Sequence, residues 1–154
     1  MIASIEEIEQ ICRTLRENNL KIVFTNGCFD ILHIGHIKYL KEAKTYGDKL
    51  IVGLNSDSSV RRLKGMQRPI VPENERAEVL DSLKPVDYVV IFEEDTPMEL
   101  IKIVKPDVLV KGGDYTEENI VGANYVGSYG GRVIVIPYVA GRSTTSLIDK
   151  IRKL

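Results

Sequence analysis

Residues 21–40 read "KIVFTNGCFDILHIGHIKYL", a β-branched apolar run joined to a helix-like run through a turn at Gly27. From residue 21 to the C-terminus, strand-like runs alternate with helix-like segments. The strand-like runs are residues 21–26, 49–55, 87–92, 107–111 and 132–137. These runs are continuously apolar, as expected where both faces of a sheet are covered. Strand, crossover helix and strand, repeated to five strands, predicts an α/β fold with a Rossmann-like parallel sheet in the order 3-2-1-4-5 and helices on both faces.

An additional helix is predicted before the first strand, within residues 1–20. Ser4 and Glu7 have the spacing of a capping box. The apolar residues that follow fall on one helical face: Ile5, Ile8, Cys12 and Leu15. At 154 residues the chain is most simply one domain, with this helix followed by a catalytic core over residues 21–154.

Three later helix starts have local signals. Thr96 offers an N-cap before Pro97, and a similar signal at Pro72 predicts a helix that ends near Leu83. The last helix is expected to start at the hydroxyl cluster of residues 143–145.

Composition excludes several classes of protein. The net charge of −1 argues against a general binder of nucleic acid or membrane surfaces. No apolar run approaches the roughly 18 residues of a membrane span, and the acidic opening "MIASIEEIEQ" is not a signal peptide. The two cysteines have no metal or redox spacing, so we expect a cytoplasmic protein with free thiols.

The only two histidines, His33 and His36, lie on either side of Gly35. Ligands of parallel α/β sheets bind beyond the carboxyl ends of the strands, and the free N–H groups of a helix start favour anions. Two imidazoles at this place therefore suggest a polyphosphate site. Local hydrogen bonding of the rings is the plainer alternative, and a zinc site lacks an obvious third ligand. Neither a Walker A lysine nor a dinucleotide G-x-G-x-x-G is present.

The segment "GCFDILHIGH" resembles the histidine signature of the cytidylyltransferase-like branch of the nucleotidyltransferase superfamily. Three further segments, "NSDSSVRRLKGMQRPI" (55–70), "VKGGDY" (110–115) and "GRSTTSLI" (141–148), look like the adenylyltransferase domain of ADP-heptose synthase. The resemblance runs from about Lys21 to the C-terminus. Four segments in the right order are a strongly specific signal.

The resemblance implies that ATP and D-glycero-D-manno-heptose 1-phosphate react to give ADP-heptose and pyrophosphate, for lipopolysaccharide or other surface-polysaccharide synthesis. Mg²⁺ is expected to arrive with ATP, since no carboxylate cluster is evident to hold it. In many bacteria such a domain follows a sugar kinase. Here we expect a separate kinase upstream, no nucleic-acid or membrane partner, and an architecture compatible with a homodimer.

The resemblance also implies roles for individual residues. Those expected to be catalytic are His33, His36 and Lys64. Those expected to bind the nucleotide are Gly27, Cys28, Phe29, His33, Gly35, His36, Lys111, Gly112, Gly113, Ser143, Thr144 and Thr145. Those expected to bind the second substrate are Asp30, Asn55, Asp57, Arg62, Lys64, Arg68 and Arg76. We expect Arg61 to be a solvated helix residue instead, with Gly65 ending that helix.

Other functions remain open at this point. A cytidylyltransferase that uses CTP and glycerol 3-phosphate is the nearest enzymatic alternative, but Tyr138 and the acidic "FEEDTP" stretch (92–97) replace basic residues of those relatives. A nucleotide-binding regulator without turnover is an alternative of another class, against which the intact motifs argue. A purely structural partner of a separate kinase is the weakest alternative.

Overall fold

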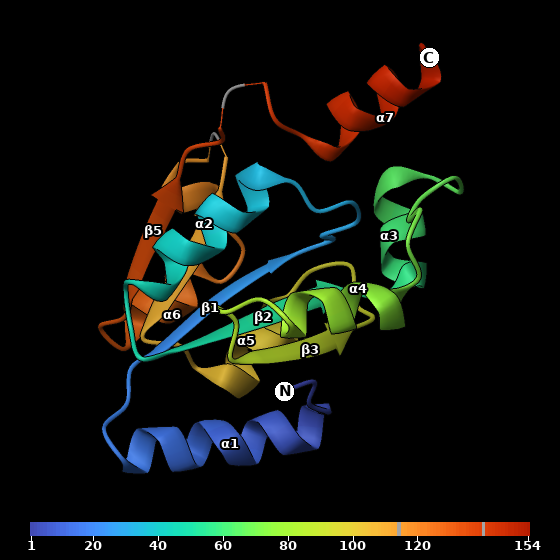
Figure 1. Ribbon diagram of the computed structural model, residues 1–154. Helices are drawn as coiled ribbons and strands as arrows, with labels where there is room; N and C mark the ends of the chain where they lie inside the picture. Colours follow the sequence, from blue (N-terminus) through green and yellow to red (C-terminus); the bar gives the residue numbers. More distant parts are fainter. Residues whose placement is uncertain (114, 140) are drawn as a thin grey trace.

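The computed structural model describes residues 1–113, 115–139 and 141–154 and contains a five-stranded sheet, in which every pairing is parallel (Figure 1). The strand order β3-β2-β1-β4-β5 confirms the prediction. The strands are β1 (Ile22–Gly27), β2 (Lys49–Asn55), β3 (Tyr88–Phe92), β4 (Val108–Gly112) and β5 (Arg132–Ile136). Their bounds differ from the predicted ones by at most one residue at either end.

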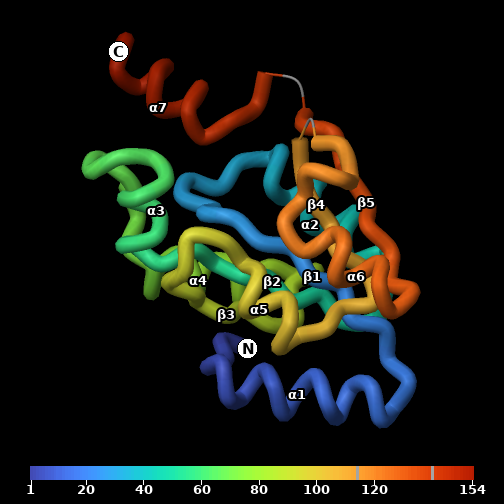
Figure 2. The backbone as a smooth tube through the Cα atoms, turned by 180° about the vertical axis from the view of Figure 1, so that it is seen from behind, coloured from blue at the N-terminus to red at the C-terminus, as the bar shows by residue number. Residues whose placement is uncertain are grey.

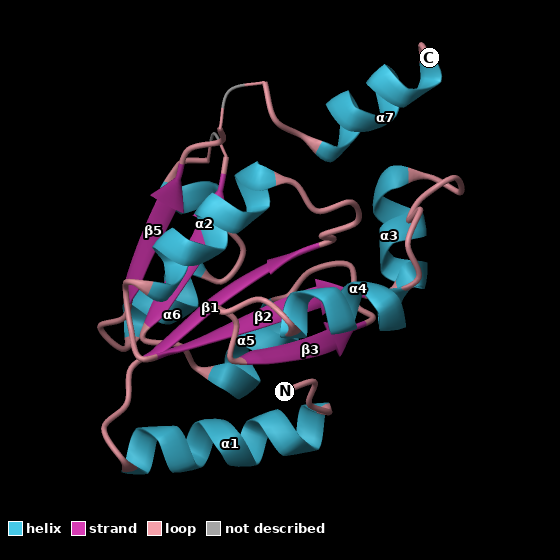
Figure 3. Ribbon diagram, viewed as in Figure 1, coloured by secondary structure: helices cyan, strands magenta, loops and turns pink. Residues whose placement is uncertain are grey.

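Most of the helices pack around the sheet, as Figure 3 shows by colour. The helices are α1 (Ile5–Glu17), α2 (Ile34–Lys44), α3 (Asp57–Lys64), α4 (Glu73–Asp81), α5 (Met98–Val104), α6 (Ala123–Ser128) and α7 (Thr144–Arg152), with a 3₁₀ turn η1 at Glu117–Asn119. In the described ranges, none of these helices has the length and apolar character needed to cross a membrane.

Two hydrophobic clusters lie on opposite faces of the sheet, because successive strand residues point to opposite sides. Ile22 and Phe24 of β1 pack into the cluster formed with α1, α5 and α6. Val23 packs into the other cluster, formed with α2 and α4. Figures 1 and 2 show these two helix groups from opposite sides. The predicted cover of helices on both faces is therefore confirmed.

The predicted N-terminal helix is confirmed as α1, with its capping box between Ser4 and Glu7. Two other helix ends differ from the prediction. The predicted N-cap Thr96 is wrong, because Pro97 takes the cap position and its carbonyl accepts the first helical bond from Ile101. Helix α4 ends at Asp81, two residues before the predicted end near Leu83.

Helix α7 stands apart from the sheet, beside α3, in both Figure 1 and Figure 2. It begins after the N-cap Ser143, as predicted, and none of its described residues is buried. The hydroxyl of Thr144 donates to the Ile31 carbonyl at 3.1 Å. That bond brings the start of α7 to the loop that follows β1, so two predicted motifs meet beyond the carboxyl end of the central strand.

Candidate active site

The two histidines form the start of α2. His33 is the N-cap, and its Nδ1 accepts a hydrogen bond from the Gly35 N–H at 3.0 Å. The His33 N–H in turn donates to His36 Nδ1 at 3.3 Å. The ring centroids lie 4.0 Å apart. The pair therefore closes a capping box in which imidazoles replace the usual hydroxyl and carboxylate.

These bonds determine which ring nitrogen each histidine offers to a ligand. A neutral imidazole carries one proton, and Nδ1 accepts in both rings, so the proton resides on Nε2. Burial, together with the smaller effects of the nearby His33 and Lys64, lowers the pKa of His36 to about 4. Burial and Arg142 also lower the pKa of His33. At neutral pH both rings are uncharged Nε2–H donors.

Gly35 is required by the close approach of His33. A Cβ at residue 35 would lie 2.7 Å from Cε1 of the His33 ring, which is too short for any real contact. Phe29 supports the same loop from inside, since it is buried and its ring centroid lies 5.5 Å from that of His36. A Cβ at Gly27 would meet the Phe29 ring at 3.0 Å. Gly27 and Phe29 thus fix the shape of the histidine loop, residues 28–33, which joins β1 to α2.

The start of α7 forms the opposite side of a small cavity of about 260 Å³. Its lining residues are His33, Ile34, Gly141, Arg142, Ser143, Ser146, Leu147 and Lys150. Of the predicted hydroxyls, Ser143 lines the cavity and Thr144 binds the Ile31 carbonyl. Thr145 is exposed and is not among the lining residues. The cavity therefore brings Ser143 to His33, as expected of an anion site built from two helix starts.

Of the residues that line this cavity, sequence reasoning predicts His33 and Ser143 and misses the others, Ile34, Gly141, Arg142, Ser146, Leu147 and Lys150. Ser146 is the third helical residue and makes a capping box with Ser143, with bonds of 2.9 and 3.2 Å. A serine three residues after an N-cap is a readable signal. Lys150 lies two turns into α7, and no local pattern distinguishes it from other helix lysines.

Lys64 and Arg62 have different surroundings, although both end α3. Lys64 is exposed, and its charge acts on both His36 and Cys28, which places it beside the histidine loop. Arg62 pairs with Asp95 at 2.6 Å and donates to the Glu93 carbonyl. Arg62 is therefore directed toward the loop after β3, and the structure does not bring it to the histidines. Gly65 ends the helix, as predicted, with φ of 99°.

Several residues predicted to bind the second substrate lie in the interior instead. The Asp30 carboxylate accepts from the N–H groups of Ile70 and Val71 at 2.9–3.0 Å, and Arg68 Nε lies 3.7 Å from it. Buried Asn55 donates to Ser59 at 3.0 Å. Arg76, with a side chain that is 0% exposed, pairs with Asp57 at 2.8 Å. The polar groups of Asp30, Asn55 and Arg76 are thus bonded to other residues of the protein, and the structure does not direct them toward a substrate.

Strand β4 pairs with β1 at Val108 and Leu109, as the strand order requires, and Lys111 follows near its carboxyl end. Burial lowers the pKa of Lys111, and its Nζ lies 5.5 Å from the Tyr115 ring centroid. Burial raises the pKa of the Cys28 thiol, which lies within electrostatic reach of Lys64 and Lys111. Both lysines therefore lie within electrostatic reach of the histidine loop at Cys28.

Gly112 and Gly113 lie where neighbouring aromatic rings leave little room for a side chain. A Cβ on Gly112 would lie 3.1 Å from the Tyr39 ring. Gly113 has φ of 113°, a conformation that favours glycine, and a Cβ there would lie 2.8 Å from the Tyr138 ring. Their predicted approach to a nucleotide stays a prediction.

A protein-held metal does not fit the residues that are present. Within the described ranges, no group of three or more His, Cys, Asp or Glu side chains is arranged to hold a metal ion. The nearest candidate, Asp30, already accepts from two backbone N–H groups. Asp30 is therefore engaged in bonds within the protein.

Comparisons with known proteins agree with this picture. A family model described as cytidylyltransferase-like matches residues 24–139. The chain is 59% identical over 150 residues to the Bifunctional protein HldE of Geobacter metallireducens, covering 97% of this chain and 31% of that protein. The HldE protein of Nitratiruptor sp. is 58% identical over 151 residues, covering 98% of this chain and 32% of that protein. The chain thus spans about a third of the length of these curated relatives.

Two solved structures are also similar. The lipopolysaccharide core biosynthesis protein from Thermoplasma volcanium GSS1 is 34% identical with a TM-score of 0.63, covering 78% of this chain and 97% of that one. A pantoate-beta-alanine ligase from Francisella tularensis has a TM-score of 0.66 at 20% identity, covering 100% of this chain and 78% of that one, and shows the fold alone. Because the family model spans most of the chain, the predicted family is confirmed: the chain belongs to the cytidylyltransferase-like family of nucleotidyltransferases.

Proposed function

We propose that the chain is an adenylyltransferase that converts ATP and D-glycero-D-manno-heptose 1-phosphate to ADP-heptose and pyrophosphate. The observation that carries this proposal is the pair of neutral Nε2–H donors at the start of α2, beyond the carboxyl end of the central strand. High identity to proteins named Bifunctional protein HldE supports the choice of heptose. So does the similarity to a lipopolysaccharide core biosynthesis protein.

The chemistry requires positioning and charge stabilisation. A sugar-phosphate oxygen attacks the α-phosphorus of ATP, the bond from that phosphorus to the bridging oxygen breaks, and pyrophosphate leaves with the electron pair. His33 and His36 donate through Nε2–H to the phosphate oxygens on which negative charge grows. Both rings are fixed beforehand by their Nδ1 bonds, so little reorganisation is needed during the reaction.

The cations around the histidines divide between the two substrates. Arg142 and Lys150 line the cavity together with His33 and Ser143, which suits the departing pyrophosphate. Lys64 and Lys111 lie near Cys28, on the side where the α-phosphate and the sugar phosphate would meet. ATP enters as its magnesium complex, so Mg²⁺ is part of this substrate. A sugar kinase must form the sugar 1-phosphate beforehand.

The direct test is pyrophosphate release in the presence of Mg²⁺, with ATP or CTP paired in turn with each anomer of heptose 1-phosphate and with glycerol 3-phosphate. The proposal predicts turnover with ATP and one heptose anomer. Turnover only with CTP and glycerol 3-phosphate would assign the chain to the other enzymatic branch. ATP binding without turnover on any substrate would favour the regulator.

A further inference from the structure

Arg76, in the first turn of α4, has its guanidinium enclosed by protein. Its side chain is 0% exposed, and it donates four hydrogen bonds. Nε donates to the Val71 carbonyl at 2.8 Å, and Nη1 donates to the carbonyls of Cys28 at 2.7 Å and Asn55 at 2.8 Å. Nη2 donates to Asp57 Oδ1 at 2.8 Å. A buried cation requires such partners, and this one presents no exposed surface to a ligand.

The four partners belong to three separate segments. Cys28 is in the histidine loop, Asn55 and Asp57 lie where β2 passes into α3, and Val71 precedes α4. A second link joins the same regions, because Asp30 of the histidine loop accepts from the N–H groups of Ile70 and Val71. Residues 57–71 are therefore fastened to the histidine loop at both of their ends.

Lys64 lies between these two fastened ends. The Asp57 link holds the start of α3, and the links at Ile70 and Val71 hold the far end of the segment. Lys64 itself is exposed, with its charge close to His36 and Cys28. The place of this cation relative to the histidines thus depends on bonds that it does not make itself.

We propose that Arg76 is a positioning residue that sets Lys64 at the distance from the histidine loop that transfer between two anionic substrates requires, without touching either substrate. The inference rests on the proposed function. The sequence predicts that Arg76 binds the second substrate directly. In the proposal Arg76 instead acts on Lys64 through residues 57–71. A displacement of about 1 Å can cost roughly 100-fold in rate, so loss of this positioning is measurable.

A double-mutant cycle between residues 76 and 64 tests the proposal. Arg76→Lys keeps the charge but cannot make all four bonds, and we expect kcat/KM to fall by about 100-fold. In a Lys64→Ala background the same change should cost less than about threefold, because its effect passes through Lys64. Full additivity of the two losses would overturn the proposal.

Controls separate positioning from general destabilisation. Ala77→Gly loosens the next residue of α4, also buried, but keeps all four Arg76 bonds. It should lower Tm and leave kcat/KM of the folded protein within about twofold. Asp57→Ala removes one link only and keeps the test available if Arg76→Lys does not fold. The fall in kcat/KM caused by Asp57→Ala should be smaller than that caused by Arg76→Lys. It should likewise be reduced in the Lys64→Ala background.

Hydrogen exchange gives a readout that does not depend on activity. The amides of Ile70 and Val71 should exchange faster in Arg76→Lys, whereas that of Phe24 in β1 should not change. Unchanged exchange at Ile70 and Val71 would overturn the positioning role even if activity fell. If the wild-type chain releases no pyrophosphate, the proposed function and this inference both fail. An active wild type with additive losses removes the inference alone.

Discussion

Helices α1 and α2 begin with the same pattern of hydrogen bonds made by different side chains. In α1 the Ser4 hydroxyl accepts from the Glu7 N–H at 3.1 Å, and the Glu7 carboxylate accepts from the Ser4 N–H at 3.3 Å. In α2 both acceptors are histidine Nδ1 atoms. The difference is charge. The first turn of α1 carries Glu6 and Glu7, whereas the first turn of α2 has no acidic residue.

This difference decides what each helix start can do. The carboxylates of α1 compensate the partial positive charge of the helix dipole and stabilise the fold. The neutral imidazoles of α2 satisfy backbone N–H groups but leave that positive potential available to an anion. The same local motif therefore serves stability at one helix and supports ligand binding at the other.

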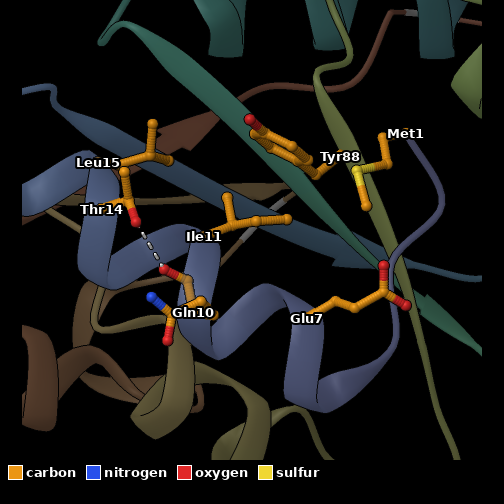
Figure 4. A pocket seen from close by; sticks show the side chains of 7 residues that line it. All are labelled: Met1, Glu7, Gln10, Ile11, Thr14, Leu15 and Tyr88. Carbon is orange, nitrogen blue, oxygen red and sulfur yellow. Dashed lines mark hydrogen bonds between the residues drawn. The ribbon is translucent and has the colours of Figure 1, made fainter.

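The surroundings of the two helix starts strengthen the contrast. A groove of about 390 Å³ lies beside α1, larger than the cavity at α2. Figure 4 shows its wall, with Ile11 and Leu15 from α1 and Tyr88 from β3. Glu7 is also part of this wall, and its carboxylate repels phosphate. Size alone does not identify the site; charge and hydrogen-bond donors do.

The largest expected effect comes from removing one donor at α2. In His36→Asn the side-chain oxygen takes the place of Nδ1 and keeps the bond to the His33 N–H, but Nε2–H is lost. We expect kcat to fall by about 100- to 1,000-fold, the cost of deleting one donor to a developing charge. Steady-state pyrophosphate release measures this loss.

The matched variant His36→Gln places an N–H near the position of Nε2 and should retain more activity than His36→Asn. Circular dichroism and Tm should show both variants folded. Equal turnover of His36→Asn and the wild type would contradict the role of the Nε2 donor.

A smaller effect is expected when α2 is given the charge of α1. Ile34 is the first residue of α2, is 49% exposed and lines the cavity. In Ile34→Glu the carboxylate should weaken binding of Mg²⁺–ATP by about tenfold through repulsion, while stabilising the helix by a few tenths of a kcal/mol, roughly the range for a first-turn acid. Calorimetric titration gives the Kd, and Ile34→Gln controls for shape. Tighter binding in Ile34→Glu would refute the anion site.

The reverse comparison uses the cap of α1. Ser4→Ala should lower the free energy of unfolding by about 1 kcal/mol, because the Glu7 N–H loses its acceptor. Urea denaturation measures this change. Activity of the folded protein should not change, since α1 lies away from the histidines; a loss of kcat would mean that α1 has a role beyond stability.

The sequence predicts the sheet and the α1 cap because both depend on local signals. Continuous apolar runs identify the strands, and Ser4 with Glu7 has the usual capping spacing. The α2 cap is harder to read, since histidine is not a common cap residue and the box exists only in one ring orientation. The predicted N-cap at Thr96 fails for a related reason, because the backbone conformation of Pro97 decides where α5 starts.

The basic residues show what sequence cannot decide. Arg62, Lys64 and Arg76 are all cations near one motif, yet one pairs with Asp95, one is exposed beside the histidine loop and one is buried. These differences arise from contacts with segments distant in sequence, such as Cys28 for Arg76. A motif can therefore locate a site, but tertiary packing determines which of its cations face a ligand.

The smallest expected effect is a pH dependence that α1 cannot produce. In the unfolded chain His36 takes up a proton near its ordinary pKa of 6.5, whereas burial lowers its pKa in the folded protein to about 4. Between these values the unfolded state binds more protons, so stability is lost as pH falls from 6.5 toward 4. We expect less than about 1 kcal/mol, because the ring is only partly buried and solvent screens its charge.

Urea denaturation at pH 7.5 and pH 5 measures this loss, and NMR titration of the histidine ring follows the proton directly. His36→Asn is the matched variant, since it keeps the cap and removes the titrating group at residue 36, while His33 and the carboxylates are the same in both proteins. The wild type should therefore lose more stability than His36→Asn between the two pH values. An equal loss in both proteins would mean that His36 is protonated as readily in the folded state as in the unfolded one. The conclusion that a neutral imidazole distinguishes α2 from α1 would then have to be abandoned.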